Sequence, residues 1–417
     1  MSGRTHIVGA GLAGLSAAVH QIKAGRDVSL HEGAGHAGGR CRSYRDAALG
    51  RQIDNGNHLL LSANRSALAY LKDIGAGDSL SGPGKAEFPF LDLESGERWT
   101  VGLGPGFLPR AILSKSSRVP GSRAFDYLKS LKLLWAGENA TVAQCLGTDN
   151  ALFRRFWEPM TLAILNTSAE EGAASLLKAT VRETLLKGEA ACRPLIAKEG
   201  LSESFVDPAL RFLIERGAGV GFNRLLKEFQ IEDTKVTGLN FGGELLTLNP
   251  DDTVILAVPS IAAAGLVPGL EAPTISRAIV NGHFLLEREA GALDFLGLVG
   301  GTAQWLFVRG SVVSVTVSAA DALADEDTPV IAERLWADVA TALGLGGSPM
   351  PAHRIVKERR ATFAQTPEQV KRRHRPETHL ENLFLAGDWT DTGLPATIEG
   401  TIRSGVKASE TVLLSGY

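Results

Sequence analysis

The chain has 417 residues, which exceeds the usual size of a single hydrophobic core and predicts two lobes. Hydrophobic residues make up 44% of it and charged residues 21%, the balance of an ordinary soluble globular protein. The formal net charge of −3 argues against a nucleic-acid-binding protein, because such proteins carry a clustered basic face. The one basic run, residues 371–375, is interpreted as a solvated loop.

Three cysteines are too few and too scattered for a disulfide framework or a zinc site, and the histidines are not spaced as ligands, so no metal site is expected. A reducing, cytoplasmic location fits best. The apolar run over residues 7–19 is broken by glycines and is unlike a signal peptide. The longest uncharged stretch, 253–270, contains two prolines and is not expected to span a membrane. Attachment to the inner face of the cytoplasmic membrane stays open.

The first thirty residues predict one βαβ unit. An apolar strand over residues 6–8 is followed by a helical pattern over 15–24 and a second strand over 27–31. A Gly-x-Gly-x-x-Gly motif lies between the first strand and the helix, and Glu32 ends the second strand. This context, rather than the glycines alone, predicts a dinucleotide-binding site. It disfavours the alternative of a glycine-rich turn that binds no ligand.

Each residue of this motif has a physical task. Gly9 permits the tight turn, Gly11 lets the backbone approach a pyrophosphate, and Gly14 allows the helix to pack closely on the strand. The first turn of the helix, which includes Ala13, presents unpaired N–H groups and a positive dipole end to the phosphates. The carboxylate of Glu32 can accept hydrogen bonds from the ribose hydroxyls.

The rest of the chain predicts a helical region followed by strands. The predicted elements in chain order are a mostly helical region over 62–199, a helix from 207 to 216, strands over 220–223, 226–231, 236–241, 244–248, 253–258, 278–286, 304–308 and 312–317, a helix over 329–343, a strand over 383–386, and a helix over 398–414.

The glycine motif does not separate NAD from FAD, but other segments do. Residues 38–43 read Gly-Gly-Arg-Cys-Arg-Ser, and residues 383–388 read Leu-Phe-Leu-Ala-Gly-Asp. They resemble the GG doublet and the C-terminal AGD segment of the flavin-dependent amine oxidase and phytoene desaturase superfamily. Residues 217–239 and 252–259 resemble the second segment of its FAD-binding lobe. The resemblance implies FAD as the cofactor.

The resemblance also implies roles for individual residues. In this superfamily the C-terminal strand returns to the first lobe, so both ends of the chain hold the flavin. Ile398, which opens the last helix, would offer its N–H to the flavin O2, and the helix dipole would stabilise negative charge on the reduced ring. The backbone of Leu226 would contact the adenine, and Asp388 would bind the ribityl chain. The other residues expected to line the cofactor are Gly38, Gly39, Arg40, Asn57, Gly387 and Thr397.

The expected fold class is α/β, with a Rossmann-type FAD-binding domain interleaved with an α+β substrate domain. Both domains are expected to be discontinuous. The expected ranges are 1–61, 200–265 and 355–417 for the FAD-binding domain, and 62–199 and 266–354 for the substrate-binding domain.

Residues 390–400 indicate which branch of the superfamily the chain resembles. Leu394 and Thr397 stand where an amine oxidase would carry aromatic residues, so an amine substrate would lose its cation–π cage. An uncharged, apolar substrate is expected instead. Several segments together resemble the hydroxysqualene dehydroxylases of bacterial hopanoid pathways: 54–58, 157–159, 304–307, 358–363, 386–390 and 393–400.

This resemblance implies transfer of a hydride from N5 of reduced FAD to an allylic carbon of hydroxysqualene, with loss of water and formation of squalene. Hydroxide is a poor leaving group, so an acid should protonate the oxygen. His58 and Asp391 are the candidates, the second on condition that burial keeps its carboxyl group protonated. Two alternatives stay open: the histidine only hydrogen-bonds the backbone, and the aspartate only caps a turn. Glu399 either acts in the site or supports the last helix, and His283 is interpreted as a core histidine.

The expected partners follow from this chemistry. They are a polyisoprenoid substrate, an unidentified electron donor and a membrane surface, which the loop from Leu103 to Pro109 with Arg110 could touch. A phytoene-type desaturase, which moves the hydride in the reverse direction, is the alternative enzyme. A lipid-binding escort without flavin is the alternative that is not an enzyme.

Overall fold

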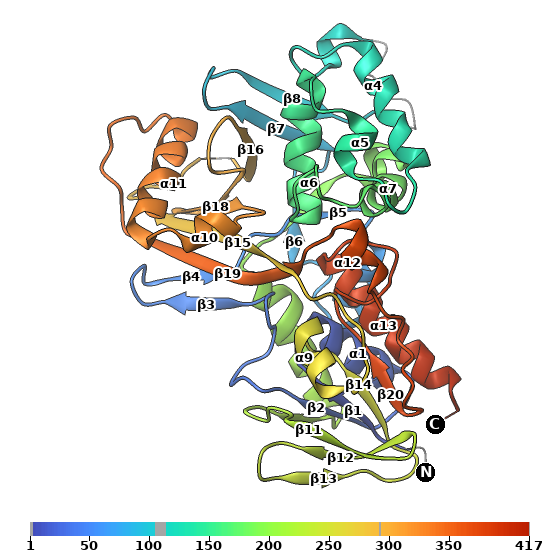
Figure 1. Ribbon diagram of the computed structural model, residues 1–417. Helices are drawn as coiled ribbons and strands as arrows, with labels where there is room; N and C mark the ends of the chain where they lie inside the picture. Colours follow the sequence, from blue (N-terminus) through green and yellow to red (C-terminus); the bar gives the residue numbers. More distant parts are fainter. Residues whose placement is uncertain (1–2, 105–113, 292, 417) are drawn as a thin grey trace.

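The computed structural model describes residues 3–104, 114–291 and 293–416 and has two lobes (Figure 1). The first lobe is built on a five-stranded sheet in which all neighbouring strands are parallel. Its strands, in spatial order, are β10 (Gly219–Gly221), β2 (Val28–His31), β1 (Thr5–Val8), β14 (Thr253–Leu256) and β20 (Leu383–Leu385). The βαβ unit and the return of the C-terminal strand to this lobe are confirmed.

Helix α1 (Leu12–Lys23) follows β1 directly. It begins three residues before the predicted start. The prediction missed this first turn because the turn contains Gly14, and glycine has a low helix propensity. It ends as predicted before Gly25, whose φ of +79° suits glycine. Its buried face includes Leu15 and Val19.

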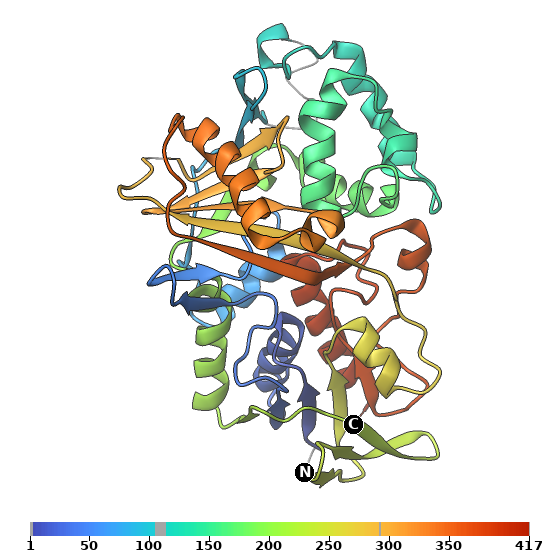
Figure 2. The same ribbon diagram turned by 60° about the vertical axis from the view of Figure 1, so that its left-hand side comes forward.

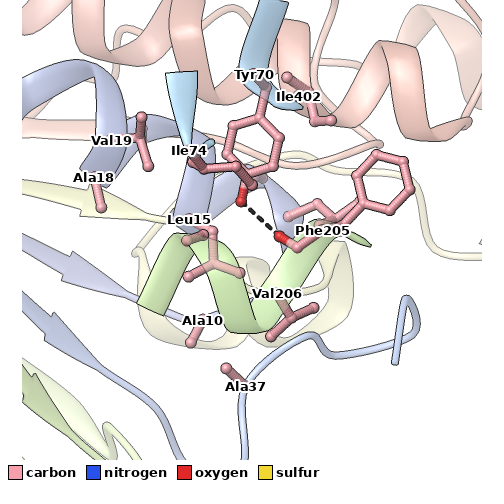
Figure 3. Packing of buried hydrophobic residues seen from close by; sticks show 14 of the residues in the cluster. Ala10, Leu15, Ala18, Val19, Ala37, Tyr70, Ile74, Phe205, Val206 and Ile402 are labelled. Atoms are coloured by element: carbon pink, nitrogen blue, oxygen red, sulfur yellow. Dashed lines mark hydrogen bonds between the residues drawn. The ribbon is translucent and has the colours of Figure 1, made fainter. Parts of the chain in front are cut away.

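Two further helices complete this part of the first lobe. Helix α13 (Ile398–Leu414) packs against α1, and its bounds match the prediction. Helix α2 (Arg65–Asp73) packs against α13, and its Tyr70 donates a hydrogen bond to the carbonyl oxygen of Phe205 at 2.8 Å (Figure 3). Tyr70 and Leu71 therefore belong to the core of the first lobe, although their range was expected in the substrate domain.

The remaining elements of the first lobe surround this sheet. A small antiparallel sheet lies at its far end (Figure 1). These elements are the π-helix η6 (Ser202–Val206), α8 (Asp207–Glu215), α9 (Ser260–Leu266), α12 (Pro367–Lys371), and the small-sheet strands β11 (Glu228–Glu232), β12 (Lys235–Asn240) and β13 (Leu245–Thr247). A hairpin, β3 (Ser43–Asp46) with β4 (Arg51–Asp54), leads toward the second lobe.

The second lobe is built on a seven-stranded mixed sheet. Its strands in spatial order are β19 (His353–Phe363), β15 (Ser276–Leu285), β18 (Val312–Val317), β17 (Trp305–Arg309), β16 (Phe295–Val299), β7 (Glu87–Asp92) and β8 (Arg98–Gly102). Helices α10 (Asp321–Asp325) and α11 (Thr328–Leu343) pack with the sheet in one buried apolar cluster; Figure 2 shows α11 against its strands.

A second apolar cluster joins the sheet to a helical region. Phe88 and Phe90 of β7 pack there with Phe295 of β16 and Trp305 of β17. The elements of the region are η1 (Lys115–Ser117), α4 (Ala124–Ser130), η2 (Leu131–Trp135), α5 (Val142–Leu146), η3 (Phe153–Trp157), α6 (Glu158–Leu165), α7 (Ala174–Glu183), η4 (Leu185–Lys187) and η5 (Glu189–Ala191). Three short strands connect the lobes: β5 (Leu60–Leu61), β6 (Leu80–Ser81) and β9 (Pro194–Ala197).

Two predictions about this lobe are wrong in part. The range 62–199 is less helical than predicted, because β7 and β8 form a hairpin after α2. Pro89 within β7 conceals the strand, since proline rarely occupies a paired strand. The strand β19 was not predicted and belongs to the second-lobe sheet, although 355–363 was expected in the FAD-binding domain. It is an edge strand, where charged residues are tolerated, and it carries many of them.

Candidate active site

The glycine turn after β1 has the geometry that its motif predicts. Gly9 has a φ of +106°, and a Cβ there would lie 2.5 Å from the carbonyl oxygen of Ala257. A Cβ on Gly14 would lie 1.8 Å from the carbonyl oxygen of Gly9, so this glycine permits the close packing of helix on turn. A Cβ on Gly11 would meet no atom within 4 Å, so open space lies beside the start of α1.

The first N–H groups of α1 are the hydrogen-bond donors beside this open space. The Leu15 N–H donates to the carbonyl oxygen of Gly11 at 2.9 Å, which is the first hydrogen bond within the helix. The N–H groups of Leu12, Ala13 and Gly14 precede that hydrogen bond, and they are the ones that a helix end offers to an anion.

Glu32 lies at the end of β2, beside the same turn. Its Oε2 accepts a hydrogen bond from the Ala10 N–H at 2.7 Å, and its Oε1 accepts one from the Ala34 N–H at 2.8 Å. The carboxylate is therefore held rigidly by backbone donors. Each oxygen keeps a lone pair for a further donor such as a ribose hydroxyl.

The GG doublet lies against the glycine turn. Gly38 forms a bridge to Gly11 and has a φ of +97°. A Cβ on Gly39 would lie 3.5 Å from the Cα of Gly11, so the two glycine segments approach closely. The N-terminal segments that were expected to enclose the pyrophosphate are thus brought together.

Arg40 joins this doublet to the C-terminal segment. Its guanidinium donates to both carboxylate oxygens of Asp388, at 2.9 and 2.8 Å, and to the carbonyl oxygen of Ala361 at 2.5 Å. The Asp388 carboxylate raises the pKa of Arg40, so the guanidinium stays charged. Asp388 is 7% exposed, and a bidentate charged pair at this burial fixes both side chains.

The C-terminal segment continues from Asp388 to α13. Gly387, with a φ of +151°, donates its N–H to the Ser404 hydroxyl at 2.9 Å. Thr397 caps α13 by accepting the Gly400 N–H at 3.2 Å, and Ile398 is its first residue. Leu226 is buried in the apolar cluster that also contains Leu256 of β14.

Arg373 also shapes this segment, and the sequence did not indicate it. It donates to the carbonyl oxygens of Leu394 at 2.8 Å and Thr390 at 2.5 Å, and it is buried beside Phe363. Burial lowers the pKa of Arg373 to about 10. The interpretation of 371–375 as a solvated loop is therefore wrong for its central residue. The four neighbouring basic residues concealed it, because a run of cations usually indicates a solvated surface.

The loop over residues 54–58 crosses between the lobes. Asn57 donates to the Thr316 hydroxyl at 3.0 Å, and that hydroxyl donates to Asn281 at 2.7 Å. Asn281 in turn donates to the carbonyl oxygen of Asn55 at 3.2 Å. This chain of hydrogen bonds ties the loop to strands β15 and β18. Asn57 therefore lies on the face of the sheet that carries the Thr316 and Asn281 side chains.

His58 lies next to this network. Burial lowers the pKa of His58, the charge of Arg40 lowers it further, and the charge of Asp54 opposes both. Asp54 is itself buried and paired with Arg309 at 2.8 Å. At neutral pH the His58 imidazole is therefore mostly neutral, and donation of a proton from it becomes easier as the pH falls.

The other candidate acids occupy different environments. Asp391 is exposed, and its Oδ1 accepts the Gly393 N–H at 3.1 Å. The burial on which its role as an acid depended is therefore absent, and the turn-capping alternative describes its contacts. Glu399 is buried, and its carboxylate accepts the N–H groups of Ser66 at 3.1 Å and Ala67 at 2.9 Å at the start of α2. It therefore joins two helices. His283 is a core histidine, as predicted, and its Nδ1 lies 2.7 Å from the Ser314 hydroxyl.

These residues fit FAD. The open space at Gly11 and the helix N–H groups suit a pyrophosphate, and the backbone-held carboxylate of Glu32 suits a ribose. The two ends of the chain meet at the Arg40–Asp388 pair, as required if both ends hold one cofactor. Within the described residues, no helix is long and apolar enough to cross a bilayer.

Comparison with known proteins agrees with this geometry. A family model described as "Flavin containing amine oxidoreductase" matches residues 12–413. The hydroxysqualene dehydroxylase of Sinorhizobium fredii is 47% identical over 413 residues, which cover 99% of each chain. That of Rhodopseudomonas palustris is 47% identical over 417 residues, which cover 100% of each chain.

More distant relatives share the fold. The zeta-carotene desaturase of Synechocystis is 21% identical, with 98% of this chain and 97% of that protein covered. The structure of an oxidoreductase from Methanosarcina mazei has a TM-score of 0.73 at 14% identity, with 98% of this chain and 100% of that one covered. The cofactor of this chain is FAD, and the fold is that of the FAD-dependent oxidoreductases. By the match over nearly its whole length and the 47% identity, the chain belongs to the hydroxysqualene dehydroxylase family of flavin-containing amine oxidoreductases.

Proposed function

We propose that the chain reduces hydroxysqualene to squalene. One C–O bond breaks and one C–H bond forms, and the hydroxyl leaves with a proton as water. Reduced FAD, when bound, supplies the hydride. The 47% identity to two hydroxysqualene dehydroxylases over the full chain carries this proposal, and the carotene desaturases are only distantly similar.

The residues that would hold the cofactor are those brought together at the two ends of the chain. The N–H groups at the start of α1 would bind the pyrophosphate, and Glu32 would bind the ribose. Arg40 and Asp388 would lie along the phosphates and the ribityl chain. Ile398 would direct the start of α13 at the flavin ring, where the positive end of the helix stabilises negative charge.

The face of the second-lobe sheet that carries the Asn281 and Thr316 side chains suits a substrate with one hydroxyl and two hydrocarbon arms. Directly paired residues of neighbouring strands share a face. Asn281, Thr316, Trp305, Gly297 and Phe90 form such a row across five strands. The row is polar at Asn281 and Thr316, beside the Asn57 loop, and aromatic at the other end. An aromatic, water-poor surface would protect an allylic cation from capture by water.

His58 is the remaining candidate for the proton donor, since the exposure of Asp391 takes away the reason for proposing that residue. An electron donor, which the sequence does not identify, would restore the reduced flavin after each turnover. This donor and contact with a membrane both stay predictions. The loop predicted for that contact runs from Leu103 to Arg110, and its residues from 105 onward lie outside the described residues.

Single-turnover oxidation of the flavin tests the proposal. The purified protein is reduced anaerobically with dithionite and mixed with hydroxysqualene in detergent, and flavin absorbance and products are followed. Flavin reoxidation with a stoichiometric yield of squalene is expected. Bleaching of the oxidised enzyme by a more saturated polyisoprene would favour a desaturase instead. A purified protein without flavin absorbance would favour the lipid-binding escort.

A further inference from the structure

Five exposed side chains lie along one face of the segment formed by α4 and η2. Phe125, Leu128 and Trp135 are 60%, 47% and 77% exposed, and Lys129 and Lys132 are exposed between them. Their spacing follows the helical repeat, so they form one stripe. These five residues are called the α4 face below.

The opposite side of the same segment is firmly packed. Leu133 and Ala136 are buried in the apolar cluster of the second lobe. The Tyr127 hydroxyl accepts the Val119 N–H at 2.8 Å, and the Trp157 indole donates to the Ser130 hydroxyl at 2.9 Å. The segment is therefore anchored in one orientation. The exposure of the α4 face follows from that anchoring.

The α4 face differs from the other exposed apolar positions of the chain. Among the described residues, the other large apolar side chains with high exposure are aliphatic, such as Ile214 on α8 and Leu414 at the end of α13. Phe125 and Trp135 are the exposed aromatic residues of the described chain. Clustered exposed aromatic groups indicate an interaction surface. Figure 1 shows α4 at the outer end of the second lobe, remote from the Rossmann sheet.

The charge around the α4 face is positive although the whole chain carries a net charge of −3. Residues 114–139 contain five Lys and Arg residues against one Asp and one Glu. The Asp126 carboxylate accepts the Arg123 N–H at 2.8 Å at the start of α4. The Lys129 ammonium lies 4.9 Å from the centre of the Phe125 ring. Aromatic and aliphatic groups with interleaved lysines suit the boundary between acyl chains and anionic headgroups.

We propose that the α4 face docks on the surface of a bilayer that contains anionic phospholipids. Phe125, Leu128 and Trp135 would enter the acyl boundary, and Lys129 and Lys132 would contact the phosphates. This docking proposal rests on the proposed function, because the substrate and product of that reaction, hydroxysqualene and squalene, partition into membranes. The anchored side of η2 and the aromatic row of the sheet share one apolar cluster, through Leu133 and Trp305.

Flotation of the holoprotein with vesicles tests the docking without any substrate. Wild type is expected to bind vesicles of phosphatidylglycerol and phosphatidylcholine and to bind pure phosphatidylcholine more weakly. The double variant Phe125→Ser/Trp135→Ser should bind the anionic vesicles at least about tenfold more weakly, because it loses buried apolar area. Lys129→Gln/Lys132→Gln should lose about thirtyfold on anionic vesicles only, since both ammonium groups would be attracted by the negative surface. Ile214→Ser, which removes an equally exposed apolar group from the first lobe, is the matched control and should bind as wild type does.

Two further measurements keep this test separate from that of the proposed function. Flavin content and single-turnover rates in detergent should be the same in the variants as in wild type. If wild type fails to turn over in detergent but still floats, the proposed function falls and the docking stands. Undiminished flotation of Phe125→Ser/Trp135→Ser would overturn the docking proposal. A dimer in light scattering that this variant converts to a monomer would overturn it as well, because the α4 face would then be covered by a second copy.

Discussion

Arg40 and Asp388 form a bidentate ion pair across 348 residues of sequence, with both N–O distances below 3.0 Å. The pair joins the GG doublet, next to the glycine turn, to the strand-and-helix segment at the other end of the chain. Under the proposed function it would close the cofactor site from two directions.

Replacement of Arg40 by Ala should weaken FAD binding by roughly tenfold to a hundredfold, because it leaves the nearly buried Asp388 carboxylate without its partner. Flavin absorbance per chain after dialysis measures the loss. Arg359→Ala is the matched control, since it removes an arginine whose pair with Asp325 is exposed on both sides. Equal flavin content in Arg40→Ala and Arg359→Ala would contradict a role for the pair in holding FAD.

Gly11→Ala and Gly14→Ala should fail in different ways. A Cβ on Gly11 meets no protein atom, so the Gly11→Ala protein should fold with an unchanged Tm. It should nevertheless bind FAD poorly, because the added methyl group would obstruct the pyrophosphate. A Cβ on Gly14 collides with the Gly9 carbonyl oxygen, so Gly14→Ala should lower stability by several kcal/mol or prevent folding. Thermal unfolding of the apoprotein, followed by flavin titration, separates the two effects. A Gly11→Ala protein that retains full flavin affinity would exclude the pyrophosphate from this space.

Glu399→Gln should affect stability rather than chemistry. Its carboxylate accepts two N–H groups of α2 and one hydrogen bond from Arg403, so loss of the charge should cost about 1–3 kcal/mol. Turnover per bound flavin should change by less than about twofold, because a catalytic acid would contribute roughly a hundredfold or more. Glu410→Gln, an exposed change on the same helix, is the control for helix stability. A hundredfold loss of turnover with normal Tm would place Glu399 in the reaction.

His58→Ala should slow flavin reoxidation by about a hundredfold or more while flavin content stays normal, if His58 donates the proton. The pKa of His58 is lowered, so its protonated fraction grows as the pH falls below about 6.5, and the wild-type single-turnover rate should rise in that direction. His58→Asn should remove this dependence. Asp391→Asn, at the exposed turn, should change the rate by less than about twofold. Undiminished turnover of His58→Ala would remove this residue from the mechanism.

Stability should fall in acid through the buried histidines. Burial lowers the pKa of His283 to about 4 from its ordinary value of about 6.5, so the native ring stays neutral where the unfolded ring takes up a proton. The unfolded state therefore binds more protons between these two values, and stability decreases as the pH falls through that window, by up to about 1.4 kcal/mol per pH unit. The urea midpoint of His283→Gln should vary less with pH over this window than that of wild type. An identical pH dependence in the two proteins would show that His283 is not the group responsible; His379→Gln, at an exposed site, is the control.

The helix over 398–414 and the βαβ unit could be predicted because their signals are local. Thr397 caps the helix through its own side chain, and Gly9 and Gly25 supply conformations that glycine favours. The family resemblance also depended on short contiguous segments, such as 38–43 and 386–390. The cofactor and the first lobe therefore follow from residues that are close in sequence.

The sequence by itself thus determined the nucleotide-binding unit, the flavin and the family. Tertiary structure decided which charged groups are buried: it placed Arg373 and Glu399 inside and Asp391 outside, and it paired the charged edge strand β19 with β15. It also gathered Phe125 and Trp135 on one exposed face. The physical reason is that glycine geometry and helix caps act over a few residues, whereas burial depends on which distant segments pack together.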